Sequence, residues 1–186
     1  MIDHGMGNLR SVAKALEAAG ASVCVTSTPS EVVAADAMCV PGQGIFGRCM
    51  TNLASAHLDR LVVDWIGEEK PFLGICLGMQ ILFEFSSEGD GHRGLGLFGG
   101  RVERLTGPVA VPHMGWNTVS DEHYYFDHSY AVFPQDASLV SGWCEHGKRF
   151  AAMIETRSVL GVQFHPEKSG RAGIDLLRDW VSKLQR

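Results

Sequence analysis

The sequence has little of what marks several large classes of protein. Its 186 residues carry a net charge of −5 without a long run of one sign, which argues against nucleic-acid binding. Its longest apolar runs are far shorter than a membrane span, and no basic segment followed by an apolar one resembles a signal peptide. We therefore expect a cytoplasmic protein whose partners include neither a membrane nor a nucleic acid.

The cysteines and histidines are equally unpatterned. Five cysteines, an odd number, lie scattered along the chain and suggest free thiols in a reducing compartment. The eight histidines form no cluster with the spacing of metal ligands, and no G-x-G-x-x-G follows a strand with an acidic residue downstream. No metal and no cofactor are therefore expected. The length and the 45% hydrophobic content suit one domain over residues 1–186.

Apolar periodicity predicts an α/β fold. Helices are predicted at 8–20, 45–66 in two pieces, 77–84 and 170–185, and strands at 23–26, 37–40 and 71–75. This alternation predicts three layers, with a mostly parallel central sheet and helices on both faces. Residues 88–107 are Gly-rich and loop-like. The middle of the chain predicts an added strand-rich antiparallel segment, with strands at 101–105, 124–126, 130–133, 150–154 and 159–164.

Residues 74–78 read G-I-C-L-G, which has the form of a nucleophile elbow with cysteine in place of serine. Cys76 would lie between a buried strand and a helix N-terminus, where partial positive charge stabilises a thiolate. Small residues are needed at 74 and 78 because the backbone bends tightly there. Taken alone, Cys76 could equally be a buried structural cysteine.

A base and an orienting group for this nucleophile occur about ninety residues later. The segment Q-F-H-P-E at 163–167 places His165 and Glu167 two residues apart, and in extended backbone such side chains point the same way. Glu167 could then hold the imidazole while His165 serves Cys76. The alternative is a surface histidine and glutamate without a catalytic role.

These two segments resemble the triad-type, class I glutamine amidotransferases, whose fold is flavodoxin-like. The segments G-M-G-N-L at 5–9 and P-H-M-G-W-N at 112–117 are similar to those of the glutaminase subunits of imidazole glycerol phosphate synthase, an enzyme of histidine biosynthesis. The resemblance implies that the chain hydrolyses glutamine to glutamate and ammonia. It also implies a heterodimer with a (β/α)₈-barrel cyclase, which receives the ammonia and forms imidazole glycerol phosphate and aminoimidazole carboxamide ribotide.

The resemblance also assigns roles to individual positions. Cys76, His165 and Glu167 would be the catalytic triad, and backbone N–H groups of Leu77 and of Gln43 or Gly44 would form the oxyanion hole. The residues implied to contact glutamine are Gln80, His128, Ser129 and Tyr130. The residues implied to face the partner are Asn8, Arg10, Trp116, Asn117 and Lys168.

Two other functions stay open at this point. The chain could supply ammonia to another synthase, such as one for anthranilate, guanylate, carbamoyl phosphate or a surface sugar, or it could be an inactive binding module. The intact triad argues against the second. The sequence also departs from the family's pattern at His4, Gln43 and Asp127. Only Met1 and Ile2 precede Asp3, where relatives carry an apolar strand, so we expect the native chain to begin several residues upstream.

Overall fold

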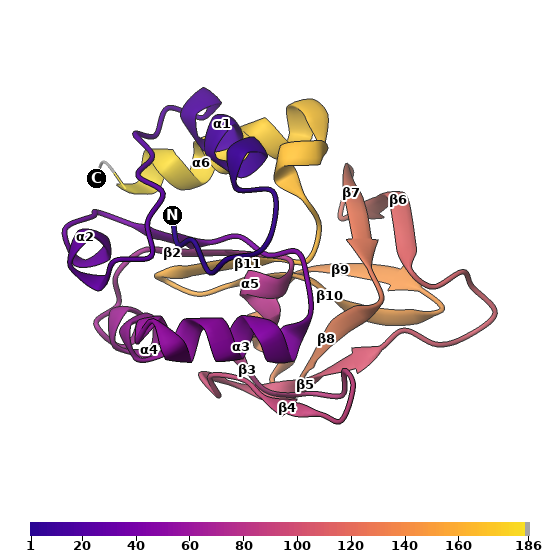
Figure 1. The fold of residues 1–186 in the computed structure, drawn as a ribbon. Helices are drawn as coiled ribbons and strands as arrows, with labels where there is room; N and C mark the ends of the chain where they lie inside the picture. Colours follow the sequence, from indigo (N-terminus) through magenta and orange to yellow (C-terminus); the bar gives the residue numbers. More distant parts are fainter. Residues whose placement is uncertain (185–186) are drawn as a thin grey trace.

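A mixed β-sheet with helices on both faces forms the centre of the computed structural model, which describes residues 1–184 (Figure 1). In spatial order its strands are β1 (Met38–Val40), β2 (Phe72–Ile75), β11 (Val159–Val162), β10 (Lys148–Glu155), β8 (Tyr130–Pro134), β5 (Phe98–Arg104), β3 (Phe83–Ser86) and β4 (His92–Arg93), and β9 (Val140–His146) pairs with β10. A separate hairpin consists of β6 (His113–Val119) and β7 (Glu122–His128).

Helices α1 (Leu9–Ala18) and α6 (Gly170–Leu184) cover one face of this sheet, and α3 (Phe46–Ser55) and α4 (Leu58–Gly67) cover the other (Figure 1). The shorter elements are α2 (Pro29–Val33), α5 (Leu77–Gln80) and the 3₁₀ turns η1 (Ala137–Leu139) and η2 (Pro166–Lys168). None of the helices in residues 1–184 combines the length and the apolar character that crossing a membrane requires.

The predicted α/β fold is confirmed, although the sheet is more mixed than expected. Strand β2 runs parallel to β1 and β11, and β3 runs parallel to β5. Only part of the strand-rich middle of the chain stands apart, as the β6–β7 hairpin. Strands β8, β10 and β11 join the main sheet, in which β10 runs antiparallel to both β8 and β11. Short connections impose this direction: only residues 156–158 link β10 to β11, too few for the crossover that parallel strands need.

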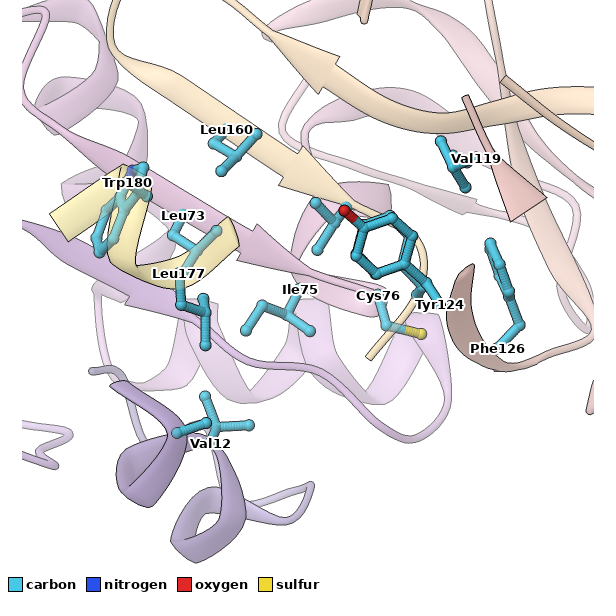
Figure 2. Packing of buried hydrophobic residues seen from close by; sticks show 14 of the residues in the cluster. Val12, Leu73, Ile75, Cys76, Val119, Tyr124, Phe126, Leu160, Leu177 and Trp180 are labelled. Carbon is cyan, nitrogen blue, oxygen red and sulfur yellow. The ribbon is translucent and has the colours of Figure 1, made fainter. Parts of the chain in front are cut away.

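Alternating side chains of the central strands pack into two separate hydrophobic cores, one on each face of the sheet. On β2, Leu73 packs toward α1 and α6, whereas Phe72 packs toward α3 and α4. Figure 2 shows the first of these layers, in which Val12, Leu177 and Trp180 meet the sheet. Because β2 is buried on both faces, it reads as a continuous apolar run, and this run ends at the elbow.

The first residues occupy a short strand position beside β1. Ile2 is fully buried, pairs in parallel with Thr26 and donates its N–H to the Cys39 carbonyl at 2.8 Å. The strand predicted at 23–26 is wrong, since only Thr26 forms a bridge. A cavity of about 680 Å³ lies beside this position, lined by Met1 and Met38 among other residues. An upstream start of the native chain stays a prediction.

The other predicted helices at 8–20, 45–66 and 170–185 are confirmed as α1, α3 with α4, and α6, with residue 185 outside the described range. The helix predicted at 77–84 is wrong, because α5 ends at Gln80 and Phe83 begins β3. The Gly-rich stretch 88–107 contains β4 and most of β5, so it is not simply a loop. The predictions missed β6, β9 and α2.

Candidate active site

Cys76 lies on a sharp turn between β2 and α5. Its backbone has φ 52° and ψ −107°, a conformation that is strained for a residue with a side chain. The turn is held by hydrogen bonds, with the Cys76 N–H donating to the Val162 carbonyl at 2.6 Å and the Cys76 carbonyl accepting from Met79 and Gln80. This is the geometry of a nucleophile elbow, which presents the side chain at the end of the sheet.

Glycines make this turn possible, as the sequence predicts. A Cβ on Gly78 would overlap the Val40 carbonyl oxygen, and a Cβ on Gly74 would lie 2.6 Å from the Gly78 carbonyl oxygen. The elbow is therefore pressed against both its own strand and β1. The Leu77 amide, the first after the nucleophile, has no acceptor in the part of the chain that the structure describes.

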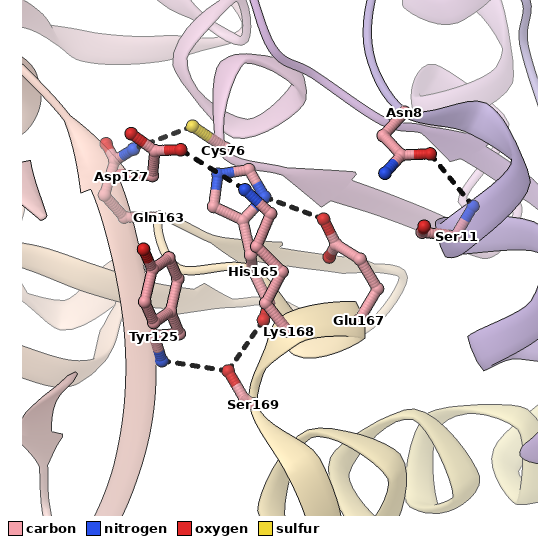
Figure 3. Close-up of polar contacts among 10 residues, drawn as sticks. All are labelled: Asn8, Ser11, Cys76, Tyr125, Asp127, Gln163, His165, Glu167, Lys168 and Ser169. Carbon is pink, nitrogen blue, oxygen red and sulfur yellow. Dashed lines mark hydrogen bonds and ion pairs between the residues drawn. The ribbon is translucent and has the colours of Figure 1, made fainter. Parts of the chain in front are cut away.

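His165 and Glu167 meet beside Cys76. The imidazole Nδ1 lies 2.8 Å from Glu167 Oε1, and the two side chains are only 1% and 2% exposed. Figure 3 shows the imidazole between Cys76 and Glu167. The ring is also fixed through its backbone, since Ser169 Oγ donates to the His165 carbonyl and accepts from the Tyr125 N–H.

The electrostatics of this group favour a charged imidazole. Burial alone lowers the pKa of His165, but the adjacent Cys76 sulfur and the Glu167 carboxylate outweigh it and raise the pKa to about 10. Two buried atoms of this pair, His165 Nε2 and Glu167 Oε2, have no hydrogen-bond partner within residues 1–184. An imidazolium with one free N–H beside a sulfur suits a thiolate–imidazolium pair.

A buried amide network adjoins the sulfur on its other side. Gln163 Nε2 lies 3.4 Å from Cys76 Sγ, and Gln163 Oε1 accepts from Gln80 Nε2 at 2.9 Å. The same Gln80 nitrogen donates to the Tyr130 carbonyl at 2.9 Å. The amino group of Gln80 is thus fully engaged inside the protein, and Oε1 is its remaining polar atom.

The loop at residues 41–44 packs directly on the elbow. A Cβ on Gly42 would lie 2.7 Å from the Gly78 nitrogen, so the loop and the start of α5 touch backbone to backbone. Gly44 has φ +135°, which only glycine adopts readily, and it faces Met6. The Gln43 amide nitrogen lies beside Gly7. The two segments predicted to supply oxyanion donors are therefore adjacent.

The segment 128–130 reaches the site through its backbone and an imidazole chain. His128 Nδ1 contacts the Tyr130 carbonyl at 2.8 Å and must donate to it, so His128 Nε2 accepts from His113 Nδ1 at 3.0 Å. His113 Nε2 in turn accepts from Asn117 Nδ2 at 3.2 Å. The Ser129 carbonyl accepts from the Leu105 N–H and extends the pairing of β8 with β5 by one residue.

Both imidazoles are neutral in this arrangement. Burial, helped by the neighbouring His146, lowers the pKa of His113 to about 4. Burial also lowers the pKa of His128 to about 3, against the opposing effect of the Tyr130 carbonyl and with help from the nearby histidines. Asn117, His113 and His128 therefore form a fixed hydrogen-bond relay. It ends at the Tyr130 carbonyl, which also accepts from Gln80.

Some of the residues predicted to face a partner gather on the outer face of the β6–β7 hairpin. Trp116 is 59% exposed and lies edge-on to Tyr125, and the Lys168 ammonium lies over the Tyr125 ring. Met114, 62% exposed, is opposite Asp127, which pairs with Lys168 at 3.2 Å. We call these residues, Met114, Trp116, Tyr125, Asp127 and Lys168, the hairpin patch.

The other predicted interface residues lie elsewhere. The Asn117 side chain is on the opposite face of β6 and donates inward, to the Glu145 carbonyl and to His113. Asn8 is exposed and caps α1 by accepting from the Ser11 N–H at 3.2 Å, and Arg10 is exposed on the first turn of that helix (Figure 3).

Two residues of the site were not predicted from the sequence. Gln163 stands in the Q-F-H-P-E motif but was assigned no role, and the hydrogen bond of His113 to His128 was not foreseen. A signal existed for Gln163, since it is a lone amide in the apolar run 159–164 and is fully buried.

Within residues 1–184 no group of three or more His, Cys, Asp or Glu side chains has an arrangement that could hold a metal ion.

Comparisons with known proteins give matches over nearly the whole chain. The family model described as glutamine amidotransferase class-I matches residues 1–184. Imidazole glycerol phosphate synthase subunit HisH of Rhodopirellula baltica is 42% identical, with 98% of this chain and 96% of that protein covered. The subunit of the same name from Dechloromonas aromatica is 45% identical over 97% and 94%. A crystal structure of a glutamine amidotransferase has the same fold, with a TM-score of 0.78, 17% identity and coverage of 100% and 98%.

Proposed function

Because the chain belongs to the class I glutamine amidotransferase family, we propose that it is the glutamine-hydrolysing subunit of an imidazole glycerol phosphate synthase. The observation that carries the proposal is the elbow cysteine beside a buried, carboxylate-held imidazole. The names of its relatives, which cover nearly the whole chain at 42% and 45% identity, point to histidine biosynthesis.

The geometry supports a thioester mechanism. Cys76 Sγ, as the thiolate, attacks the side-chain amide carbon of glutamine, and the His165 imidazolium gives its proton to the departing nitrogen, which leaves as ammonia. A γ-glutamyl thioester remains on the sulfur. His165, now neutral, removes a proton from water, which attacks the thioester and releases glutamate. Glu167 holds the ring orientation and stabilises the imidazolium at each stage.

The tetrahedral intermediates of both steps carry an oxyanion. The Leu77 N–H is a suitable donor, because it follows the nucleophile and has no acceptor among residues 1–184. A second donor comes from the Gln43–Gly44 segment, which directly follows Gly42, the residue that packs against Leu77 and Gly78 of the elbow. The glycine at 44 lets this peptide rotate, and we expect the isolated subunit to hydrolyse glutamine slowly until its partner is bound.

Glutamine is held by the groups around the elbow. Gln80 Oε1 is free to accept from the substrate's ammonium group, because the Gln80 amino group is engaged by Gln163 and Tyr130. Ser129 is only partly buried and contributes its hydroxyl. His128 acts from behind, since its ring nitrogens bind the Tyr130 carbonyl and His113.

A protein partner follows from both the chemistry and the surface. Ammonia released into water would protonate and diffuse away, so a second active site must dock against this one. The hairpin patch suits a docking surface, since it combines exposed apolar side chains at Met114 and Trp116 with a lysine near the catalytic turn. The partner is the (β/α)₈-barrel cyclase, in a heterodimer of the cytoplasm.

The test is synthase activity of the reconstituted complex with two nitrogen sources. Replacing Cys76 with Ala is expected to abolish synthesis with glutamine and to leave synthesis with ammonium salts near the wild-type rate. Cys144→Ala is the matched control, because this thiol is also buried but lies in β9, away from the elbow. Loss of both activities in Cys76→Ala, or glutamine use by that variant, would overturn the proposal.

A further inference from the structure

Gln163 is the one amide that contacts the reacting sulfur within residues 1–184. It follows β11 directly, is fully buried, and its Nε2 lies 3.4 Å from Cys76 Sγ. Its backbone N–H donates to the Ala152 carbonyl at 2.8 Å, so the residue is anchored to β10 as well. A buried amide costs free energy unless its polar atoms are satisfied, and here one of its donors is satisfied by sulfur.

Chemistry fixes which end of this amide faces the sulfur. The Gln80 terminal atom lies 2.9 Å from both the Tyr130 carbonyl oxygen and the terminal atom of Gln163. A carbonyl oxygen accepts only, so the Gln80 atom must be its amino nitrogen. That nitrogen needs an acceptor on Gln163, which turns the Gln163 oxygen toward Gln80 and its amino group toward Cys76. Flipping either amide would set like groups against each other.

An N–H group aimed at sulfur favours the thiolate over the thiol. Hydrogen bonds to an ionised acceptor are stronger than bonds between neutral groups, and the difference stabilises the charged form. The sulfur also lies near the imidazolium of His165 on its other side (Figure 3). Two N–H groups of different kinds therefore lie beside Sγ. Gln163 Nε2 is neutral and within hydrogen-bond distance, whereas His165 Nε2 belongs to a charged ring that can transfer its proton and has no hydrogen-bond partner within residues 1–184.

We infer that Gln163 is a further catalytic residue of this site, whose side-chain N–H holds Cys76 Sγ on the elbow and stabilises its thiolate, with Gln80 locking that orientation. The inference rests on the proposed function only in taking Cys76 as the nucleophile. It assigns Gln80 a second duty besides substrate contact. It also explains why a fully buried polar side chain stands at the end of an otherwise apolar strand.

The experiment measures the rate at which iodoacetamide alkylates Cys76 between pH 5.5 and 9 in the full chain, with each cysteine quantified by peptide mass spectrometry. The reagent reports the thiolate fraction directly and needs no glutamine turnover. Gln163→Met keeps the length of the side chain and removes the donor. Gln163→Glu keeps the shape and replaces the donor with a negative charge. Gln135→Met, at an exposed position, is the matched control.

We expect Gln163→Met to lower the alkylation rate of Cys76 at pH 6 roughly tenfold, the value of one hydrogen bond to a charged atom, with little change in the plateau at high pH. Gln163→Glu should lower it further, and Gln80→Met should lower it less than Gln163→Met. Gln135→Met should match the wild type. The inference is overturned if the profiles of both Gln163 variants coincide with that of the wild type.

The same measurement monitors folding. Burial raises the pKa of Cys39 and Cys49 to about 12, so both stay unreactive while the protein is folded. A variant that alkylates rapidly at these two positions has unfolded, and the comparison then depends on the remaining variants of Gln163 and Gln80. A failure of the proposed function would appear separately, as a wild-type chain with a reactive Cys76 that does not support glutamine-dependent synthesis.

Discussion

The relay of His113 and His128 makes the stability of the fold depend on pH, and the structure gives the size of the effect. Both imidazoles are buried and neutral, with pKa values of about 4 and about 3, whereas an unfolded chain titrates its histidines near 6.5. Below pH 6.5 the unfolded state therefore binds more protons than the folded state. The stability contributed by each residue is present above the unfolded pKa and is lost as the pH falls toward the folded value.

Between pH 7 and pH 5, each of these two imidazoles lowers the free energy of unfolding by about 2 kcal/mol, and together they lower it by about 4 kcal/mol. His165 acts in the opposite direction, because its pKa is raised to about 10. The stability that His165 contributes is complete below pH 6.5 and is lost as the pH rises toward 10. Going from pH 7 to pH 5 therefore raises its contribution to the free energy of unfolding by less than about 1 kcal/mol. The expected net loss is about 3 kcal/mol, a large share of the stability of an ordinary domain.

Urea unfolding at pH 7 and pH 5, at constant ionic strength, measures this difference. In His113→Gln one titrating group is gone, while the amide can still donate to His128 and accept from Asn117, so the loss should shrink to about 1 kcal/mol. His57→Asn is the control, because His57 is exposed and asparagine tolerates its left-handed backbone. The reasoning is refuted if the wild type is equally stable at both pH values, or if His113→Gln loses as much stability as the wild type.

Three further outcomes are expected. His165→Ala should lower glutamine turnover by the complex at least about 100-fold in a kcat assay, and Glu167→Gln only about tenfold, since an amide oxygen still accepts from the ring; equal losses would deny the orienting role. Gly78→Ala should lower the free energy of unfolding by at least about 2 kcal/mol, whereas Gly67→Ala, where a Cβ meets open space, should leave it unchanged or raise it. Denaturant unfolding of the two variants measures this difference, and equal stabilities would contradict the prediction. Trp116→Ala should weaken binding to the partner subunit at least about 30-fold in calorimetry, and an unchanged Kd would place the interface elsewhere.

The parts of the fold that the sequence predicts best are those whose signal is local. The amphipathic spacing of α1 and α6 and the apolar run of β2 needed no knowledge of their neighbours. The elbow was predictable because a tight turn demands small residues at 74 and 78, and the structure places a carbonyl against each.

The errors arise where tertiary contacts override local preference. Residues 77–84 suit a helix, but Phe83 pairs with Phe98 in the sheet, so α5 stops after one turn. Strand β6 escaped prediction because histidine, glycine and asparagine hide its alternation, which follows from an inner face packed on the protein and an outer face that carries Trp116.

The site was predictable at the triad and not in the network around it. Cys76, His165 and Glu167 are polar residues in short motifs whose spacing carries chemistry. Gln163 and His113 act through contacts with residues 87 and 15 positions away, which depend on the pairing of strands and leave no trace in local spacing. Asn117, expected at an interface, donates inward because β6 turns alternate side chains to opposite faces.

The central claim is that Cys76 carries the γ-glutamyl group during turnover. The most direct test is to quench the complex with acid while it hydrolyses isotopically labelled glutamine and to locate the label by peptide mass spectrometry. The account predicts an acid-stable, hydroxylamine-sensitive adduct on the peptide containing Cys76, and none on the peptides of the other four cysteines. Steady turnover with no adduct on Cys76, or with the label on another residue, would contradict it.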